Sequence, residues 1–434
     1  MLKYSALIAL WLPAILLIAN GPSTVFGRLN ERQLQERELK EPGDAVLLWN
    51  DEALNAVRSL RLGAFDAARA YGILNVAMFD AANGLDGPDA QFRYALVEPA
   101  SGVVKGNKVA AVSSAASNVL SQLFPDSAIH FENQLNEIKV LLSRVGVKQN
   151  FIKRGEKWGS IVGNAVFKMR SDDGSTPKET LTGSDSPGKF RNDFGSAAFR
   201  NMDSIVVDDP LAYASAGPPA LTSPEYLAAH TEVRLLGNAN YENSEYDEIF
   251  SFWKAGGGSV RPPGEWIKIA QIVAKEQGTV ESLSKTTLLF GALSIALADT
   301  SIAVAFDKFT YQFWRPATAI QNADTDGNDT VQDSAWAPRN GSNGSSPEHT
   351  SGQSAFAGAA STILAEFFGT DNIQFTAEGD NSIAGGRTYA SFSDAAREAG
   401  RSRIFSGIHF EFSNQAGQAT GRGVAREVIE WQKQ

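Results

Sequence analysis

Three short segments in the last third of the sequence carry side chains that could bind an anion. The first is Lys308-Phe-Thr-Tyr-Gln-Phe-Trp-Arg315, in which two cations stand seven residues apart among aromatic side chains. Seven residues make about two turns of an α-helix, so both cations are expected on one helical face. Burying two unpaired cations is costly, and an anion would have to meet them. The alternative is a pair of surface cations whose heads reach into water.

The second segment, Ser351-Gly352-Gln353, stands where a long polar loop gives way to an Ala-rich, apolar stretch. Free backbone N–H groups at a helix start bind oxyanions, and glycine lets the backbone approach a ligand closely. The alternative is ordinary capping of the helix by Thr350 or Ser351.

The third segment contains Arg403 and His409, with Ser406 and Gly407 between them. On one unbroken helix the two side chains would face different ways, so the Ser-Gly pair is expected to break the helix and let them converge. The alternative is a core histidine with a separate surface arginine. Together the three segments predict a site for a tetrahedral oxyanion such as phosphate or vanadate, held by charge-assisted hydrogen bonds.

The elements that would position these segments are predicted to be helical throughout. Apolar residues recur at intervals of three and four, and no stretch shows the period-two alternation of a strand. The expected helices are 45–60, 64–83, 110–123, 131–145, 148–169, 223–236, 246–253, 266–275, 282–308, 351–368 and 391–433, the last with a turn near Ser406. The fold class is therefore predicted to be an all-α bundle with long surface loops, over 171–223 and 324–350.

The domain organisation is predicted from composition. Residues 1–27 fit a secretory signal peptide of uncertain cleavage site, with one early lysine and a short apolar run; the alternative is an uncleaved anchor. Residues 28–43 form a polar leader. Residues 44–434 are expected to be a single helical domain with the oxyanion site in 300–425, and no later stretch is expected to span a membrane.

Composition narrows the possible partners. The net charge of −10 argues against a nucleic acid, whose phosphates need a basic face. With no cysteine and four histidines, thiolate metal sites are excluded and a three-histidine metal site is nearly so. The signal peptide predicts a secreted protein, and sequons at Asn328, Asn340 and Asn343 suit N-glycosylation in one loop.

The motifs Lys-x6-Arg-Pro, Pro-x3-Ser-Gly and Ser-Arg-x5-His resemble the signature of the vanadium haloperoxidase and type 2 phosphatidic acid phosphatase superfamily. Their context resembles the soluble haloperoxidase-related branch, as the segments 313–320, 346–352 and 401–409 indicate. The resemblance is specific over residues 300–425 and looser over 45–300, where the segment 67–83 contributes to it.

The resemblance implies one vanadate per chain as cofactor. Lys308, Arg315 and Arg403 would bind its oxygens, and Ser351 with the N–H of Gly352 would complete the cradle. His409 matches the residue that coordinates vanadium in the peroxidases and attacks phosphorus in the phosphatases.

The implied function is a secreted haloperoxidase that uses hydrogen peroxide to oxidise a halide or an organic acceptor. Assembly into a homo-oligomer is left open. An acid phosphatase with His409 as nucleophile is one alternative. A non-catalytic oxyanion-binding protein is the other.

Gln353 departs from the family pattern. The family usually has histidine at this position, and that histidine serves as the acid–base group. Glutamine can hydrogen-bond a ligand but does not titrate near neutral pH, and losing a general acid–base group costs about 10²–10⁴ in rate. His349 is a candidate substitute, but it is expected to be a loop residue packed outside the cradle. Whether Asp80 or Glu348 lies near the cradle is left open.

Overall fold

The computed structural model describes residues 41–86, 92–99, 105–176 and 178–433. The expected signal peptide and most of the polar leader lie outside these residues. Within them the chain forms thirteen α-helices, several short 3₁₀ turns and one two-stranded sheet, so the all-α fold class is confirmed.

The first half of the chain builds one group of helices. It contains α2 (Asp44–Leu60), α3 (Ala64–Asn83), α4 (Lys108–Leu123), α5 (Ala128–Arg144) and α6 (Gln149–Arg170), with η2 (Pro125–Ser127) before α5. The long loop that follows carries η3 (Ala197–Asn201) and η4 (Pro210–Tyr213).

The second half contains the remaining elements. They are α7 (Pro224–Leu236), α8 (Ser244–Trp253), α9 (Arg261–Glu276), η5 (Thr279–Glu281), α10 (Leu283–Tyr311), α11 (Pro316–Gln321), η6 (Ala323–Thr325), α12 (Gly352–Phe368), β1 (Phe375–Ala377), β2 (Arg387–Tyr389), α13 (Phe392–Phe405) and α14 (Glu411–Lys433).

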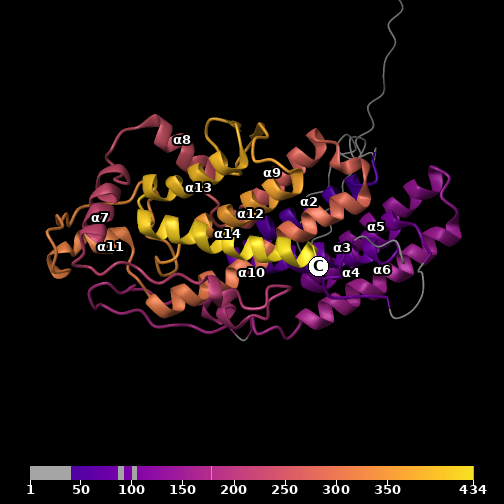
Figure 1. Ribbon diagram of the computed structural model, residues 1–434, viewed down its shortest axis with the longest axis horizontal. Helices are drawn as coiled ribbons and strands as arrows, with labels where there is room; N and C mark the ends of the chain where they lie inside the picture. The colour runs from indigo at the N-terminus through magenta and orange to yellow at the C-terminus, as the bar shows by residue number, and fades with distance from the viewer. Residues whose placement is uncertain (1–40, 87–91, 100–104, 177, 434) are drawn as a thin grey trace, which may run out of the picture.

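The helix α10 lies at the centre of the molecule and joins the two halves. It packs on α3 from the first half and on α12 and α14 from the second. In Figure 1, α5 and α6 lie at one end of the molecule and α7 and α11 at the other, with α10, α12 and α14 between them. Because α10 is apolar on all faces, its length and composition would allow it to cross a membrane. However, 94% of its most apolar window is buried inside the protein, which is consistent with the expectation that no later stretch spans a membrane.

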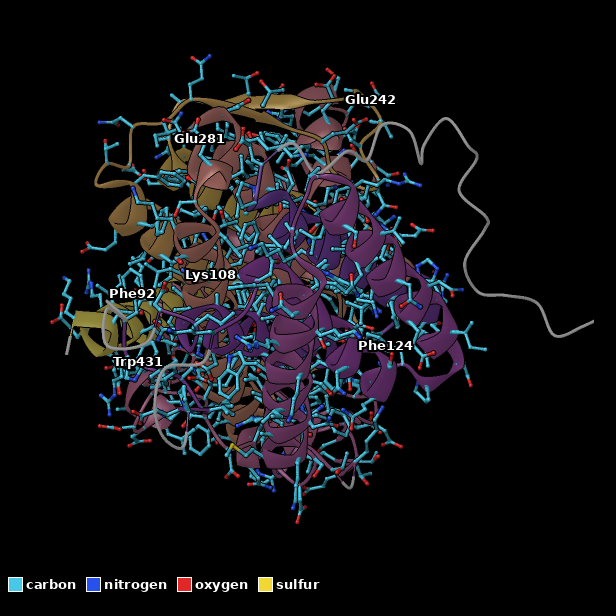
Figure 2. All side chains as sticks on the ribbon, turned by 90° about the vertical axis from the view of Figure 1, so that its right-hand side faces the viewer. Phe92, Lys108, Phe124, Glu242, Glu281 and Trp431 are labelled. Carbon is cyan, nitrogen blue, oxygen red and sulfur yellow. The ribbon has the colours of Figure 1, made fainter. Side chains whose placement is uncertain are left out.

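The close packing of α6 on α4 in the first half depends on glycines of α6. A Cβ atom on Gly159 of α6 would come within 2.0 Å of the carbonyl oxygen of Ala111 in α4, and Gly155 and Gly163 lie against the same helix. These contacts allow the close approach of α6 to α4. Side chains fill the space between the helices, from Phe124 after α4 on one side to Trp431 of α14 on the other (Figure 2).

The small antiparallel sheet was not predicted from the sequence. β1 and β2 pair with Phe375 opposite Tyr389 and Ala377 opposite Arg387. Strands of three residues are too short to establish a period-two pattern, so the expectation of no strands fails here without changing the fold class. The hairpin carries Asp380 back onto α2 and α9, where it bonds Arg58 and Lys268.

Candidate oxyanion site

The predicted site residues come from five neighbouring elements at one end of α10. Lys308 lies in the last turn of α10, Arg315 precedes α11, and Ser351 caps α12. Arg403 lies in the last turn of α13, and His409 stands between α13 and α14. α12 packs against α10, α13 and α14, so the three sequence segments are brought together.

The two cations of the first segment converge, but not as predicted. α10 ends at Tyr311, and Gln312 takes a left-handed conformation with φ 47°, so Lys308 and Arg315 do not share a helical face. They meet instead at one loop. The ammonium of Lys308 donates to the carbonyl oxygen of Pro347 at 2.5 Å, and the guanidinium of Arg315 approaches the same oxygen at 3.4 Å. Both side chains are buried, which excludes the alternative of surface cations.

The guanidinium of Arg315 is fixed from several sides. Its Nε donates to the carbonyl oxygen of Ser346 at 2.8 Å, and its Nη1 donates to the carbonyl oxygen of Ile408 at 2.7 Å. Burial lowers its pKa to about 10, while the nearby Glu348 acts in the opposite direction. The group therefore stays charged at neutral pH in a fixed orientation.

Arg403 places a second guanidinium near the first. Its Nη1 donates to the carbonyl oxygen of Trp253 at 3.3 Å, and its buried Nε has no hydrogen-bond partner. Burial, and secondly the charge of Arg315, lowers the pKa of Arg403 to about 10. An anion between the two guanidinium groups would offset this unfavourable effect.

His409 reaches the cations because the helix before it ends where the sequence predicts. α13 stops at Phe405, and Gly407 takes a left-handed conformation with φ 75°. A Cβ atom on Gly407 would lie 2.5 Å from the carbonyl oxygen of Gly237, so only glycine fits this turn. The buried imidazole then lies with its Nε2 3.0 Å from Nη1 of Arg315. The predicted convergence of the third segment on the first is confirmed.

Glu348 is a site residue whose role the sequence left open. Its fully buried carboxylate accepts a hydrogen bond from Nδ1 of His409 at 2.8 Å and one from the N–H of Phe410 at 3.0 Å. Burial raises the pKa of Glu348 to about 7, against the opposing effects of Arg315, of the Phe410 N–H and of Lys308. Asp80, the other open candidate, lies elsewhere and accepts the N–H groups of Ala95, Leu96 and Val97.

The protonation of His409 follows from its two partners. An arginine can only donate, so Nε2 of His409 must be the acceptor and Nδ1 must carry the proton. Burial, followed by the charges of Arg315 and Lys308, holds the pKa of His409 well below its ordinary value. The imidazole is therefore neutral, with the Nε2 lone pair on the side of the cations.

The start of α12 is capped and leaves a polar side chain without a partner. The hydroxyl of Ser351 accepts the N–H of Ser354 at 3.4 Å, as the capping alternative predicts, while the first N–H groups of a helix have no partner within it. A Cβ atom on Gly352 would meet only ordinary contacts, the nearest at 3.7 Å, so packing does not demand glycine there. The buried Nε2 of Gln353 has no partner.

His349 is held by a serine of the long loop. Its Nε2 lies 2.7 Å from Oγ of Ser215, and its ring packs against Tyr311 and Phe412. Burial, then the charge of Lys308, lowers the pKa of His349 to about 3, so the ring is neutral. Its buried Nδ1 has no partner, and the ring is packed in the loop within reach of the charge of Lys308.

Three buried polar atoms in this small region have no hydrogen-bond partner: His349 Nδ1, Gln353 Nε2 and Arg403 Nε. Leaving such an atom unpaired costs about 1–3 kcal/mol, and most buried polar groups in proteins are paired. A polar ligand that entered the region would offer them partners. The donors present are an ammonium group, two guanidinium groups and an amide, and such a set fits an oxyanion.

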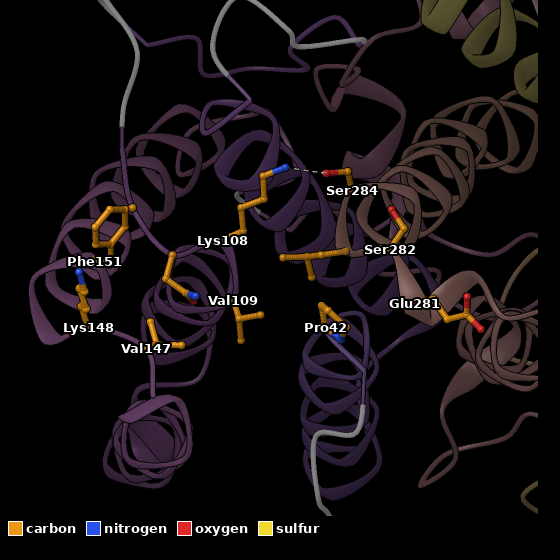
Figure 3. A pocket seen from close by; sticks show the side chains of 12 residues that line it. Pro42, Lys108, Val109, Val147, Lys148, Phe151, Glu281, Ser282 and Ser284 are labelled. Carbon is orange, nitrogen blue, oxygen red and sulfur yellow. Dashed lines mark hydrogen bonds between the residues drawn. The ribbon is translucent and has the colours of Figure 1, made fainter. Parts of the chain in front are cut away.

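A surface pocket at the other end of α10 lacks this character. It has a volume of about 680 Å³ and is lined by the starts of α4 and α10 with Lys148 and Phe151 (Figure 3). Its Lys108 is paired with Asp86 and donates to Ser284 at 3.1 Å. Ser284 and Lys308 are separated by roughly 36 Å along the helix axis, so this pocket is not part of the cradle.

Comparison with known proteins agrees with the motifs. Residues 288–434 match the family model described as the VCPO second helical-bundle domain, and this stretch contains every predicted site residue. A search of curated proteins gave no match.

Solved structures share the fold over most of the chain. A bacterial vanadium-dependent iodoperoxidase is similar with a TM-score of 0.75 and 23% identity, covering 89% of this chain and 96% of that one. A bacterial vanadium-dependent chloroperoxidase is similar in its holo form, with a TM-score of 0.62, 17% identity and coverage of 85% and 92%. An apo form of a bacterial vanadium-dependent chloroperoxidase is similar with a TM-score of 0.63 and 16% identity, covering 85% of this chain and 94% of that one.

The fold is thus that of the bacterial vanadium haloperoxidases. The family match over residues 288–434 supports the resemblance to the vanadium haloperoxidase and type 2 phosphatidic acid phosphatase superfamily that the motifs predicted.

Proposed function

We propose that this protein is a vanadate-dependent enzyme of the haloperoxidase type, which uses hydrogen peroxide to oxidise a halide. The observation that carries the proposal is the imbalance of charge in the site. Nη1 of Arg315 donates to Nε2 of His409. The charges of Lys308 and Arg403 act on the same imidazole. The carboxyl groups that act on these three basic side chains are Glu348 and Asp307, so basic groups are in excess. One vanadate per chain would supply the missing negative charge and the acceptor oxygens.

The residues present fit this cofactor. Lys308, Arg315 and Arg403 would donate to its oxygens, with the N–H of Gly352 and the hydroxyl of Ser351 at the helix start. The unpartnered Nε2 of Gln353 would gain an acceptor, and Nε2 of His409 would bind vanadium. When bound, vanadate would act as a Lewis acid that makes hydrogen peroxide reactive toward a halide.

Gln353 limits proton transfer by the protein during turnover. Its amide can donate a hydrogen bond and orient a bound oxygen, but it cannot carry a proton at neutral pH. Proton transfer would then rely on solvent, at a cost in rate. Iodide is the most easily oxidised of the common halides, and we propose it as the substrate; the likeness to an iodoperoxidase supports this choice.

The experiment is to reconstitute the purified protein with vanadate. We expect about one vanadium per chain by elemental analysis and oxidation of iodide by hydrogen peroxide. Arg403→Ala should lose both signals. Vanadium retained with no iodide oxidation above the Arg403→Ala background would reject the peroxidase and leave a binding protein.

A phosphatase remains the second candidate because Nε2 of His409 is unprotonated and could attack phosphorus. Without an acid at position 353, activity should be confined to aryl phosphates, whose leaving groups need no proton. Equal rates on aryl and alkyl phosphates would contradict this second candidate.

We also propose that the protein is exported, as its N-terminal sequence predicts. Among the three sequons, Asn328 donates its amide to the carbonyl oxygens of Leu221 and Ser223, whereas Asn343 is exposed. If a glycan is attached, Asn343 is the better acceptor. Mass spectrometry of the protein from its native source would locate the mature N-terminus and any glycan, and an intact Met1 end would contradict export by a cleaved signal.

A further inference from the structure

The side chain of Glu348 ties His409 to the loop that anchors the cations. Its Oε1 accepts hydrogen bonds from Nδ1 of His409 and from the N–H of Phe410, at 2.8 and 3.0 Å. The backbone carbonyl oxygen of the same residue lies 3.3 Å from Nζ of Lys308. One residue therefore links the imidazole to a cation of the cradle.

This contact fixes which nitrogen of His409 is free. A neutral imidazole has one donor and one acceptor nitrogen. Because the carboxylate accepts a hydrogen bond from Nδ1–H, the lone pair is on Nε2, which lies 3.0 Å from Nη1 of Arg315. Without an acceptor at Nδ1 the ring could turn or change tautomer, and Nε2 would no longer be bare.

We propose that Glu348 is a positioning residue, which holds His409 in the Nδ1–H tautomer and strengthens Nε2 as a ligand for an oxyanion centre. A carboxylate behind a ligating histidine fixes the orientation of the ring and raises its basicity. The inference deepens the proposed function and rests on it for the identity of the ligand. The tautomer itself follows from the hydrogen bonds alone.

Other groups around the ring do not supply this contact. The carboxylate of Asp307 is occupied by the N–H of Ser215 and the hydroxyl of Thr350, and His349 is bonded to Ser215. Glu348 is fully buried, and its carboxyl group also interacts with the hydroxyl of Ser413. A buried carboxylate contributes little to folding even when it is paired, so its bond to His409 favours a role in the site.

The first test compares two oxyanions in Glu348→Gln. Vanadate can accept a fifth ligand and so senses Nε2 of His409, whereas inorganic phosphate stays tetrahedral and senses only the cradle. Glutamine has the shape of glutamate and keeps an oxygen for Nδ1, but lacks the charge. We expect the vanadate affinity to fall by about 10–100-fold. Phosphate affinity should be retained or rise, because the site loses a negative charge.

Two variants frame this comparison. His409→Ala should lose the preference for vanadate over phosphate, which marks the full contribution of the imidazole. Glu265→Gln changes another buried glutamate far along the sequence and should leave both affinities as in the wild type. Equal losses of vanadate and phosphate binding in a folded Glu348→Gln variant would overturn the proposal.

The second test needs no variant and no bound ligand. Nitrogen NMR of the wild-type protein, with His409 assigned through His409→Gln, should show a proton on Nδ1 and a bare Nε2. A proton on Nε2 would overturn the positioning role even if vanadate binds. If the wild type binds neither anion, the proposed function fails while this spectrum still decides the tautomer.

Discussion

Two buried polar centres of this molecule use the same kinds of side chain and differ in their balance of charge. At the first, Asp380 in the hairpin receives Nε and Nη2 of Arg58 from α2, both at 2.8 Å, and Nζ of Lys268 from α9 at 2.9 Å. Glu265 takes a second bond from Lys268 at 3.2 Å. Two cations here meet two carboxylates.

The second centre is the oxyanion cradle, where three basic side chains lie near two carboxyl groups, Glu348 and Asp307. Most of their hydrogen bonds go to backbone carbonyl oxygens, which orient the charges without neutralising them. The balanced charges at Asp380 join the hairpin to two helices. The excess positive charge of the cradle can instead be balanced by a bound anion. Residue types alone therefore do not distinguish a structural ion pair from a binding site. The hydrogen-bond partners of the cations do, because they are carboxylates at one centre and mostly backbone carbonyl oxygens at the other.

Asp380→Asn should have the largest effect on stability and none on binding. The change leaves Arg58 and Lys268 without their shared partner. We expect a loss of about 2–4 kcal/mol in the free energy of unfolding, below the cost of breaking a fully buried pair because 32% of the Arg58 side chain is exposed.

Urea unfolding measures this loss, and Asp185→Asn at an exposed pair is the control, with an expected change under about 0.5 kcal/mol. A loss of oxyanion affinity in Asp380→Asn would show that the two centres are coupled.

Arg403→Ala should have the opposite profile. A charge-assisted hydrogen bond contributes about 1.5–3 kcal/mol, so calorimetry should show about 10–150-fold weaker oxyanion binding. Removing an uncompensated cation should leave the free energy of unfolding nearly unchanged.

The neighbouring Arg401 is the matched control, because it is paired with Glu232 and Glu411. Arg401→Ala should keep wild-type affinity, and a loss equal to that of Arg403→Ala would mean that general charge, not the cradle, binds the anion.

Gln353→His should sharpen the contrast within the cradle. A histidine at this position restores an acid–base group, so the turnover of a reconstituted enzyme should rise by about tenfold or more, toward the 10²–10⁴ that such groups supply. The rate should acquire a pH dependence near about 6.5. Gln415→His, on an exposed position of α14, serves as control. An unchanged, pH-independent rate would mean that proton transfer does not pass through position 353.

The smallest effect is expected in the pH dependence of stability. Burial alone would raise the pKa of Asp380, but its hydrogen bonds from Arg58 and Lys268 hold that pKa well below its usual range. A carboxyl group with a lowered folded pKa stabilises the protein above its unfolded pKa of about 3.9. That stability is lost as the pH falls through the folded value. The loss therefore begins below about pH 5 and continues to low pH, and urea titrations between about pH 5 and pH 2 should show a steeper fall in the wild type than in Asp380→Asn.

Much of the fold was predictable from the sequence because the helices are long and periodic. Segment 64–83 is a helix with the predicted bounds, and 282–308 was expected one residue early at its start and three residues short at its end. The break at Gly407 was also predictable, since a glycine in that place signals a left-handed residue. Such features are predictable because they depend on only a few adjacent residues.

The parts that were missed depend on contacts between distant residues or on a single unusual conformation. Nothing in the sequence around Gln312 indicates that a glutamine takes the left-handed conformation and ends α10 before Arg315. The bond between Glu348 and His409 joins residues 61 positions apart. The motif placed Glu348 close to Ser351, but only the folded chain shows that its carboxylate faces the imidazole.

The carbonyl oxygen of Pro347 is approached by both Lys308 and Arg315, and the next residue holds His409. The two adjacent residues Pro347 and Glu348 thus orient three of the ligand-binding groups. Damage to this segment should therefore abolish binding in one step, whereas replacements at Gln353 should alter it gradually. Efforts to redesign the chemistry of this protein have more freedom on the α12 side than on the Pro347 side.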